Sequence, residues 1–415
     1  MNRTIWDTLR LSTLLVGLTL LAGCGQAGSP PFRLNMVEIA RAQIPEEQQQ
    51  TIANVLTAMY GTPDDPFVLP ETGLDAAKVA LAAGPVRSDQ FGKEGGLYRR
   101  HCAHCHGTTG GGMGPTALIL NPYPRDYRQG KFKFKSTERA AKPTEIDLER
   151  IVREGVQGTA MPAFGLLPDS QIEALVEYVK YLSIRGQTEI SLINALADLS
   201  EGDELDTSRD VLVDEILTPI AESWTSAPDS IINPEPKPEI ALAQSIAQGR
   251  ELFYGTKANC VKCHGPGALG DGQTTDYDDW NKPLVEMADA IQREQQSLAN
   301  DTEMDSEQRA EIRNRVAFDS RVLETDALPP RRAIPRNLRQ NVYRGGRRPV
   351  DVYRRLYAGI NGAPMPGVGP ATPGATGTLT SDEIWNIVDY VMSLPYEAAT
   401  DHPPEQHPLV GQAKY

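Results

Sequence analysis

Apolar residues recur at helical spacing in three separated parts of the chain. In each part they occupy positions i, i+3, i+4 and i+7, which share one face of an α-helix. The three sets are Ile52, Val55, Leu56 and Met59; Ile172, Leu175, Val176 and Val179; and Ile384, Ile387, Val388 and Val391. The pattern predicts an amphipathic helix in each part, and the first of them covers residues 46–60.

The second and third of these helices close two stretches of chain that repeat one order of motifs. Each stretch begins with glycine and aromatic residues, then carries a Cys-x-x-Cys-His-Gly sequence, a Pro-Arg loop, a helix and a Met-Pro dipeptide. The loop and the helix are residues 124–130 and 146–155 in the first repeat, and 335–341 and 350–359 in the second. The chain is therefore expected to hold two related domains.

An apolar run over residues 11–21 follows Arg3 and Arg10 at the N-terminus. This order is typical of an export signal, and the run is too short to span a bilayer. It ends in Leu21-Ala22-Gly23-Cys24, which resembles the bacterial lipoprotein signal. The resemblance implies that Cys24 is lipidated and anchors an exported protein to a bacterial membrane on its periplasmic side. An ordinary signal peptide, or an uncleaved anchor with an incidental cysteine, is the alternative.

The chain has 415 residues and a formal net charge of −14. This length allows two domains that each bury a core. The negative charge argues against a nucleic-acid partner or an anionic membrane surface, because both would repel the protein. No later stretch is long and apolar enough to span a bilayer. A membrane is therefore expected as a partner only through the lipid on Cys24.

Four of the five cysteines lie in two C-x-x-C-H sequences, which form the attachment pattern for c-type haem. The two thiols add to the vinyl groups of one porphyrin, and the adjacent histidine ligates the iron. The residues are Cys102, Cys105 and His106 in the first repeat, and Cys260, Cys263 and His264 in the second. Two covalent haem c groups are expected.

Met161 and Met365 are the candidates for the distal iron ligands, because they occupy matching places in the two repeats. Haem iron accepts a thioether, and the proline after each methionine favours an extended loop. Packing in a core is the alternative for each methionine. The chain has six histidines, and the four outside the two proximal positions are poorly placed to ligate a second haem face. Bis-histidine ligation of both irons is not expected.

Arg125 and Arg336 occupy equivalent positions in the repeated Pro-Arg loop. One interpretation is that each pairs with haem propionates, which suits the forked donors of a guanidinium. The other is that each is a solvated surface residue. The sequence leaves both open.

The order of these elements resembles class I cytochrome c domains, and the pair resembles di-haem members of that family. The resemblance covers only the two haem regions. It implies a mainly α fold with two helical domains in tandem. It also implies that the first and last helices of each domain cross over the haem, where a glycine would allow close approach.

The domain division follows from these motifs and from changes in composition. We expect a signal peptide over 1–23, a tether and helical extension over 24–85, a first haem domain over 89–184, an acidic proline-containing linker over 185–239, a second haem domain over 240–395 and a tail over 396–415. An insertion at about 276–328 is charged and favours helix. It is expected to form a helical hairpin that lies on the haem domain.

Three functions compete. The first is electron transfer, in which single electrons pass through both haems between a redox protein donor and acceptor of a respiratory or dehydrogenase chain, without a small-molecule substrate. The second is a di-haem peroxidase-like enzyme, which needs one iron with an open distal position. The third is a structural zinc module. The two methionines argue against the enzyme, and the wide separation of the cysteine pairs argues against zinc.

Overall fold

The structure, a computed structural model, describes residues 30–85, 96–200, 202–370 and 378–397. Within these residues the regular structure is helical, and β pairing is limited to isolated bridges. The mainly α fold expected from the sequence is confirmed. Among the described helices, none combines the length and the apolar character needed to cross a bilayer.

The first group of helices is built around α8 (Asp169–Ala197), a helix of 29 residues. Helices from the N-terminal extension, from the first repeat and from the segment after α8 share one core with it. They are α2 (Met36–Arg41), α3 (Glu46–Tyr60), α4 (Ala76–Ala82), α5 (Leu97–His101), α6 (Ala103–His106), α7 (Glu145–Glu154), η3 (Asp210–Leu217) and α9 (Thr218–Thr225). Three short turns lie against these helices: η1 (Pro70–Thr72), η2 (Ala117–Ile119) and η4 (Ala227–Ser230). The helix expected at 46–60 is confirmed as α3.

Buried polar groups of α8 tie the N-terminal extension to this core. The backbone N–H of Asn35 donates to Glu189 Oε1 at 2.6 Å, and that of Asp75 donates to Glu177 Oε1 at 2.7 Å. Both glutamates are buried. A buried carboxylate needs such donors to offset its lost hydration. The extension is therefore an integral part of the first domain.

Arg185 supplies the counter-charge for one of these carboxylates. Its Nη1 lies 2.8 Å from Glu189 Oε2, and the two side chains are 2% and 0% exposed. The guanidinium also lies over the ring of Phe32, with Cζ 4.7 Å from the ring centroid. Removing one member of such a pair leaves an uncompensated charge in the interior. The pair therefore fixes the start of the extension against the middle of α8.

The acidic composition of residues 185–239 predicts a linker, but most of this segment belongs to the first domain. α8 continues to Ala197, and η3 and α9 fold back onto it. Leu192, Leu217 and Trp224 are buried in the same core as the first repeat. These buried apolar residues hold the segment against α8, and its acidic residues after α8 that the structure describes are exposed. Only residues 232–239 cross between the two groups without regular structure.

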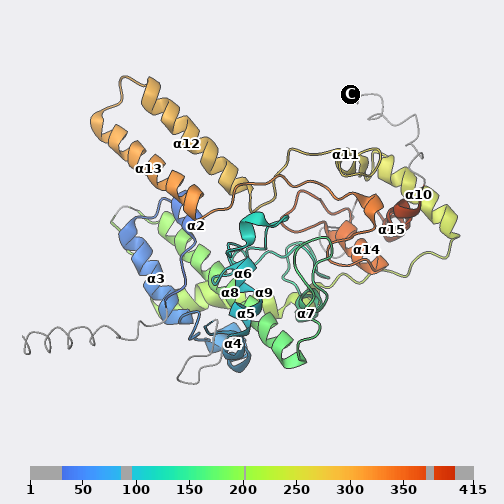
Figure 1. Cartoon of the computed structure of the whole chain (residues 1–415), viewed down its shortest axis with the longest axis horizontal. Helices are drawn as coiled ribbons and strands as arrows, with labels where there is room; N and C mark the ends of the chain where they lie inside the picture. Colours follow the sequence, from blue (N-terminus) through green and yellow to red (C-terminus); the bar gives the residue numbers. More distant parts are fainter. Residues whose placement is uncertain (1–29, 86–95, 201, 371–377, 398–415) are drawn as a thin grey trace, which may run out of the picture.

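The second group lies on the other side of Figure 1 and is smaller. Its elements are α10 (Leu242–Tyr254), α11 (Val261–His264), η5 (Leu338–Gln340), α14 (Pro349–Ala358), α15 (Ser381–Ser393) and η6 (Leu394–Tyr396). α10 and α15 cross at Gly249, where a Cβ would overlap the carbonyl of Asn386. The close crossing of the first and last helices at a glycine is thus present in the second repeat.

The insertion forms the expected helical hairpin, from α12 (Lys282–Asn300) and α13 (Ser306–Thr325). It does not lie on the second haem domain. Figure 1 shows it crossing to the first group, where it runs beside α2. Met287 and Val322 pack there against Ala40, and an ion pair of 2.6 Å joins Asp326 to Arg33. The apolar side of the hairpin packs on the N-terminal extension. The order of motifs in the sequence does not indicate this contact.

Replacing Glu189 with Ala should strip Arg185 of its carboxylate and Asn35 of its acceptor. We expect the free energy of unfolding to fall by about 3–5 kcal/mol, as for other broken buried pairs. Urea unfolding of the holoprotein, followed by far-ultraviolet circular dichroism, measures this loss. The control is Asp214→Ala, which removes an exposed partner of Arg209, and it should cost less than about 1 kcal/mol. Equal losses in the two variants would contradict the role assigned to the pair.

Candidate metal centres

Each C-x-x-C-H sequence forms a short helical turn, α6 in the first domain and α11 in the second. The backbone N–H of His106 donates to the carbonyl of Cys102 at 2.9 Å, and that of His264 donates to Cys260 at 2.9 Å. The four thiols form no disulfide and are available for thioether bonds: Cys102, Cys105, Cys260 and Cys263. The two turns therefore present the same attachment groups on the same backbone.

Each of the two histidines is oriented by a backbone carbonyl from the Pro-Arg loop. Nδ1 of His106 lies 2.9 Å from the carbonyl oxygen of Arg125, and Nδ1 of His264 lies 3.2 Å from that of Arg336. A carbonyl only accepts, so Nδ1 carries the proton and the Nε2 lone pair is left for a metal. Burial lowers the pKa of His106 to about 4 and also lowers the pKa of His264. Both imidazoles are neutral at physiological pH, which is the form that ligates iron.

The two methionine loops also share one backbone conformation. The N–H of Val156 donates to the carbonyl of Met161 at 3.2 Å, and the N–H of Ile360 donates to that of Met365 at 3.2 Å. Glycines with a left-handed φ turn the chain at matching positions: Gly155 (+67°), Gly158 (+71°), Gly359 (+73°) and Gly362 (+71°). The sequence repeat is therefore also a repeat of backbone geometry. Both methionine side chains are partly buried.

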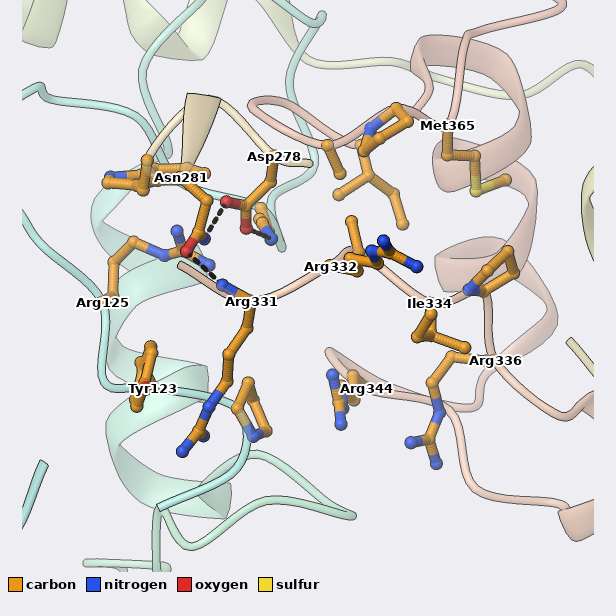
Figure 2. Close-up of a pocket in the computed structure, with 18 of the residues that line it drawn as sticks. Tyr123, Arg125, Asp278, Asn281, Arg331, Arg332, Ile334, Arg336, Arg344 and Met365 are labelled. Atoms are coloured by element: carbon orange, nitrogen blue, oxygen red, sulfur yellow. Dashed lines mark hydrogen bonds and ion pairs between the residues drawn. The ribbon is translucent and has the colours of Figure 1, made fainter. Parts of the chain in front are cut away.

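A cavity of about 1090 Å³ opens beside the second attachment turn. It brings together the residues expected to hold a haem there and surrounds them with apolar side chains. Those that line it include Cys260, Cys263, His264, Met365, Phe253, Leu356, Ile387 and Val391. In Figure 2 the side chain of Met365 points into this space. The cavity also extends along the first domain, where Met113, Tyr123 and Arg125 line it, and its volume leaves room for a macrocycle.

Two arginines of the cavity wall have no carboxylate partner among the residues that the structure describes. The Nε atoms of Arg336 and Arg344 are buried without a hydrogen-bond acceptor. Burial, together with the nearby charge of Arg336, lowers the pKa of Arg344 to about 10. The two side chains lie close together in Figure 2. Paired cations with unsatisfied donors fit a ligand that carries carboxylates, as haem does through its propionates.

Arg125 occupies a different environment, although its position in the repeat is equivalent to that of Arg336. Its guanidinium lies flat over the ring of Trp280, with Cζ 3.6 Å from the ring centroid. Burial lowers the pKa of Arg125 to about 10, while the negative charges of Asp278 and Asp126 act in the opposite direction. Trp280 and Asp278 come from the insertion of the second domain. Arg125 is therefore part of the contact between the domains and is not a solvated surface residue.

The sequence did not mark three residues of these sites. Arg344 is one of several basic residues in its segment, and Trp280 lies in the insertion, which has no counterpart in the first repeat. Tyr127 stacks on His106 with ring centroids 4.7 Å apart, and Leu338 takes its place in the repeated loop. The only signal for Arg344 in the sequence is its position in the same basic segment as Arg336.

The described part of the chain holds no cluster of three or more His, Cys, Asp or Glu side chains that would suit a metal ion. The two cysteine pairs thus do not come together, as a shared zinc site would require. The zinc module therefore finds no support in the structure.

Comparison with protein families assigns both haem regions. Residues 93–179 match the family of cytochrome c oxidase, cbb3-type, subunit III, and residues 246–395 match the cytochrome c family. Each match contains one C-x-x-C-H sequence and one Met-Pro dipeptide. The chain is a di-haem c-type cytochrome. This cytochrome carries two covalent haem c groups, and its chemistry is haem-based electron transfer.

No match to the cytochrome was found among curated proteins. A similar solved structure is the reducing HAO-like protein complex of Kuenenia stuttgartiensis. It shares 23% sequence identity and a TM-score of 0.43, over 72% of this chain and 93% of that chain.

Replacing Arg344 with Met should lower the reduction potential of the second haem, because a nearby positive charge favours the ferrous state. A change of about 1 kcal/mol, or about 40 mV for one electron, is expected for a partly screened charge. Spectroelectrochemical titration of the two haems measures the shift. The control is Arg347→Met, because Arg347 is exposed and does not line the cavity. An equal shift in both variants would show that only the overall charge matters.

Proposed function

We propose that the cytochrome passes single electrons between redox proteins through two haems that are each ligated by histidine and methionine. The proposed ligand pairs are His106 with Met161 and His264 with Met365. The observation that supports them most is that Met365 lines the same cavity as His264, on a loop that repeats the backbone of the Met161 loop.

The chain's own residues prepare each site for this role. The cysteines at 102, 105, 260 and 263 are proposed to hold the haems covalently, and haem iron supplies the one-electron chemistry when bound. The carbonyl at each Nδ1 fixes the tautomer and the orientation of the proximal imidazole, and burial favours its neutral form. In the second domain, apolar side chains line the cavity beside the attachment turn, and Arg336 and Arg344 offer positive charge to the propionates. Arg125 also lines this cavity, so a propionate role is proposed for it too, although its guanidinium lies over the ring of Trp280.

A thioether in the distal position favours an electron carrier over a catalyst. Methionine raises the potential relative to stronger donors and leaves no open site on the iron for a substrate. The proposed partners are therefore a redox protein donor and acceptor, in a respiratory or dehydrogenase chain. No small-molecule substrate is proposed.

The proposed location of the cytochrome is the periplasmic side of a bacterial membrane, where a lipid on Cys24 anchors it. The support is the Leu21-Ala22-Gly23-Cys24 sequence, which lies outside the described residues. Attachment of haem c outside the cytoplasm would agree with an export signal.

Met161→Ala and Met365→Ala should each open one iron to carbon monoxide in the ferrous state. Each should also remove about half of the weak near-infrared absorption of the ferric protein, which arises from sulfur-to-iron charge transfer. Absorption spectra of the oxidised and the carbon monoxide-treated reduced proteins measure both effects.

The control for this pair is Met113→Ala, because Met113 is 36% exposed and lies soon after the first attachment turn. It should keep the near-infrared band and stay inert to carbon monoxide. If the unaltered cytochrome instead bound carbon monoxide at one haem and turned over peroxide, the electron carrier would be rejected in favour of the peroxidase-like enzyme.

Mass spectrometry of the mature N-terminus should find Cys24 with two or three acyl chains. Cys24→Ser should yield a protein without lipid that leaves the membrane fraction while its haem content stays at two. An unmodified N-terminus at another residue would refute the lipid anchor and leave the haem assignment intact.

A further inference from the structure

Both methionine loops lie where the two domains meet. Arg139 of the first domain donates from Nη1 to the carbonyl of Met365 at 2.9 Å and from Nη2 to the carbonyl of Ala363 at 3.1 Å. In the opposite direction, Nη2 of Arg344 lies 3.5 Å from the carbonyl of Gly158, three residues before Met161. Each loop thus has carbonyls that face an arginine of the other domain.

Trp280 joins the Met365 loop to the first domain from a second side. Its indole N–H donates to the carbonyl of Asp126 at 3.3 Å, and its ring carries the guanidinium of Arg125. The same ring covers Gly362 so closely that a Cβ would not fit there. The neighbouring N–H of Asp279 donates to the carbonyl of Gly362 at 3.0 Å. The ring therefore fills the space between the first domain and the start of the methionine loop.

Opposite charges hold this part of the insertion in place. Asp278 pairs with Lys133 at 2.8 Å, with side chains 14% and 18% exposed, and Asp279 pairs with Lys131 at 3.0 Å. The first pair is shielded from solvent, so salt screens it less than a surface pair. Asp278 also accepts a hydrogen bond of 2.6 Å from the side-chain amide of Asn281, which lies beside it in Figure 2. The contacts that hold the two domains together thus lie next to the Met365 loop.

The contacts of Arg139 matter because they act on the backbone of the proposed ligand itself. The carbonyl of Met365 accepts from both Ile360 and Arg139. A loop held at this carbonyl cannot easily swing its thioether away. Loss of a group that holds a metal ligand in place commonly costs 10-fold to 100-fold in ligation.

We propose that Arg139 is a positioning residue for the second haem, so that ligation by Met365 depends on the docked first domain. This inference rests on the proposed role of Met365 as the distal ligand. It assigns a function to a residue that belongs to the other haem domain and has no place in the C-x-x-C-H or Met-Pro motifs.

The test uses the full-length ferric holoprotein in a Met161→Ala background, where the remaining near-infrared band reports on the second haem alone. Arg139→Gln should raise the apparent affinity of that haem for added imidazole by about 10-fold or more, because the thioether is displaced more easily. Arg139→Lys keeps one donor and should restore part of the difference. The control is Arg153→Gln, which removes an arginine that pairs only within the first domain.

Trp280→Leu is the second variant, and it should ease displacement of the thioether in the same direction. Arg139 is exposed, so Arg139→Gln should leave the urea midpoint unchanged, which separates positioning from folding. Parental imidazole affinity in both variants would overturn the inference, provided that Met365→Ala abolishes the band. If Met365→Ala leaves the band intact, the ligand assignment fails, and the positioning role fails with it.

Discussion

The hydrogen bond between each proximal imidazole and a distant carbonyl is the constraint around which both domains are arranged. It joins residues 19 apart in the first domain and 72 apart in the second. Its geometry is nevertheless the same, because both loops leave from a glycine after the histidine and return at a Pro-Arg step. As long as these two ends meet, the chain between them can vary in length without disturbing the imidazole.

In the second domain the longer chain between the histidine and the Pro-Arg step contains the insertion. The longer loop sends α12 and α13 onto α2 of the N-terminal extension and sets Trp280 on Arg125. A segment inside the second domain therefore adds contacts to those that the two haem domains make directly. The chain at 232–239 also touches both domains, because Ile232 donates to the carbonyl of Ser136 and accepts from Arg354. The insertion reaches the first domain at both the hairpin and its base.

Local patterns were enough to predict the attachment turns, the α3 helix and the repeated methionine loops, because each depends on residues close together in the chain. The long α8 was not predicted, since its second half continues into an acidic segment and is stabilised by η3 and α9, which come later. The difference between Arg125 and Arg336 was equally hidden. It arises from Trp280, whose indole contacts the residue after Arg125 across 154 positions of sequence. Two side chains at equivalent positions of a repeat have different environments when only one of them contacts a residue from outside the repeat.

The contacts of Arg139 with the Met365 loop also have a consequence for the affinity between the domains. Binding free energies are reciprocal, so a contact that favours ligation when the domains are docked must favour docking when the iron is ligated, by the same amount. A redox change or an incoming ligand that weakens the thioether bond would then loosen the domain contact as well. A change in the ligation of one iron would then alter the relative placement of the two domains.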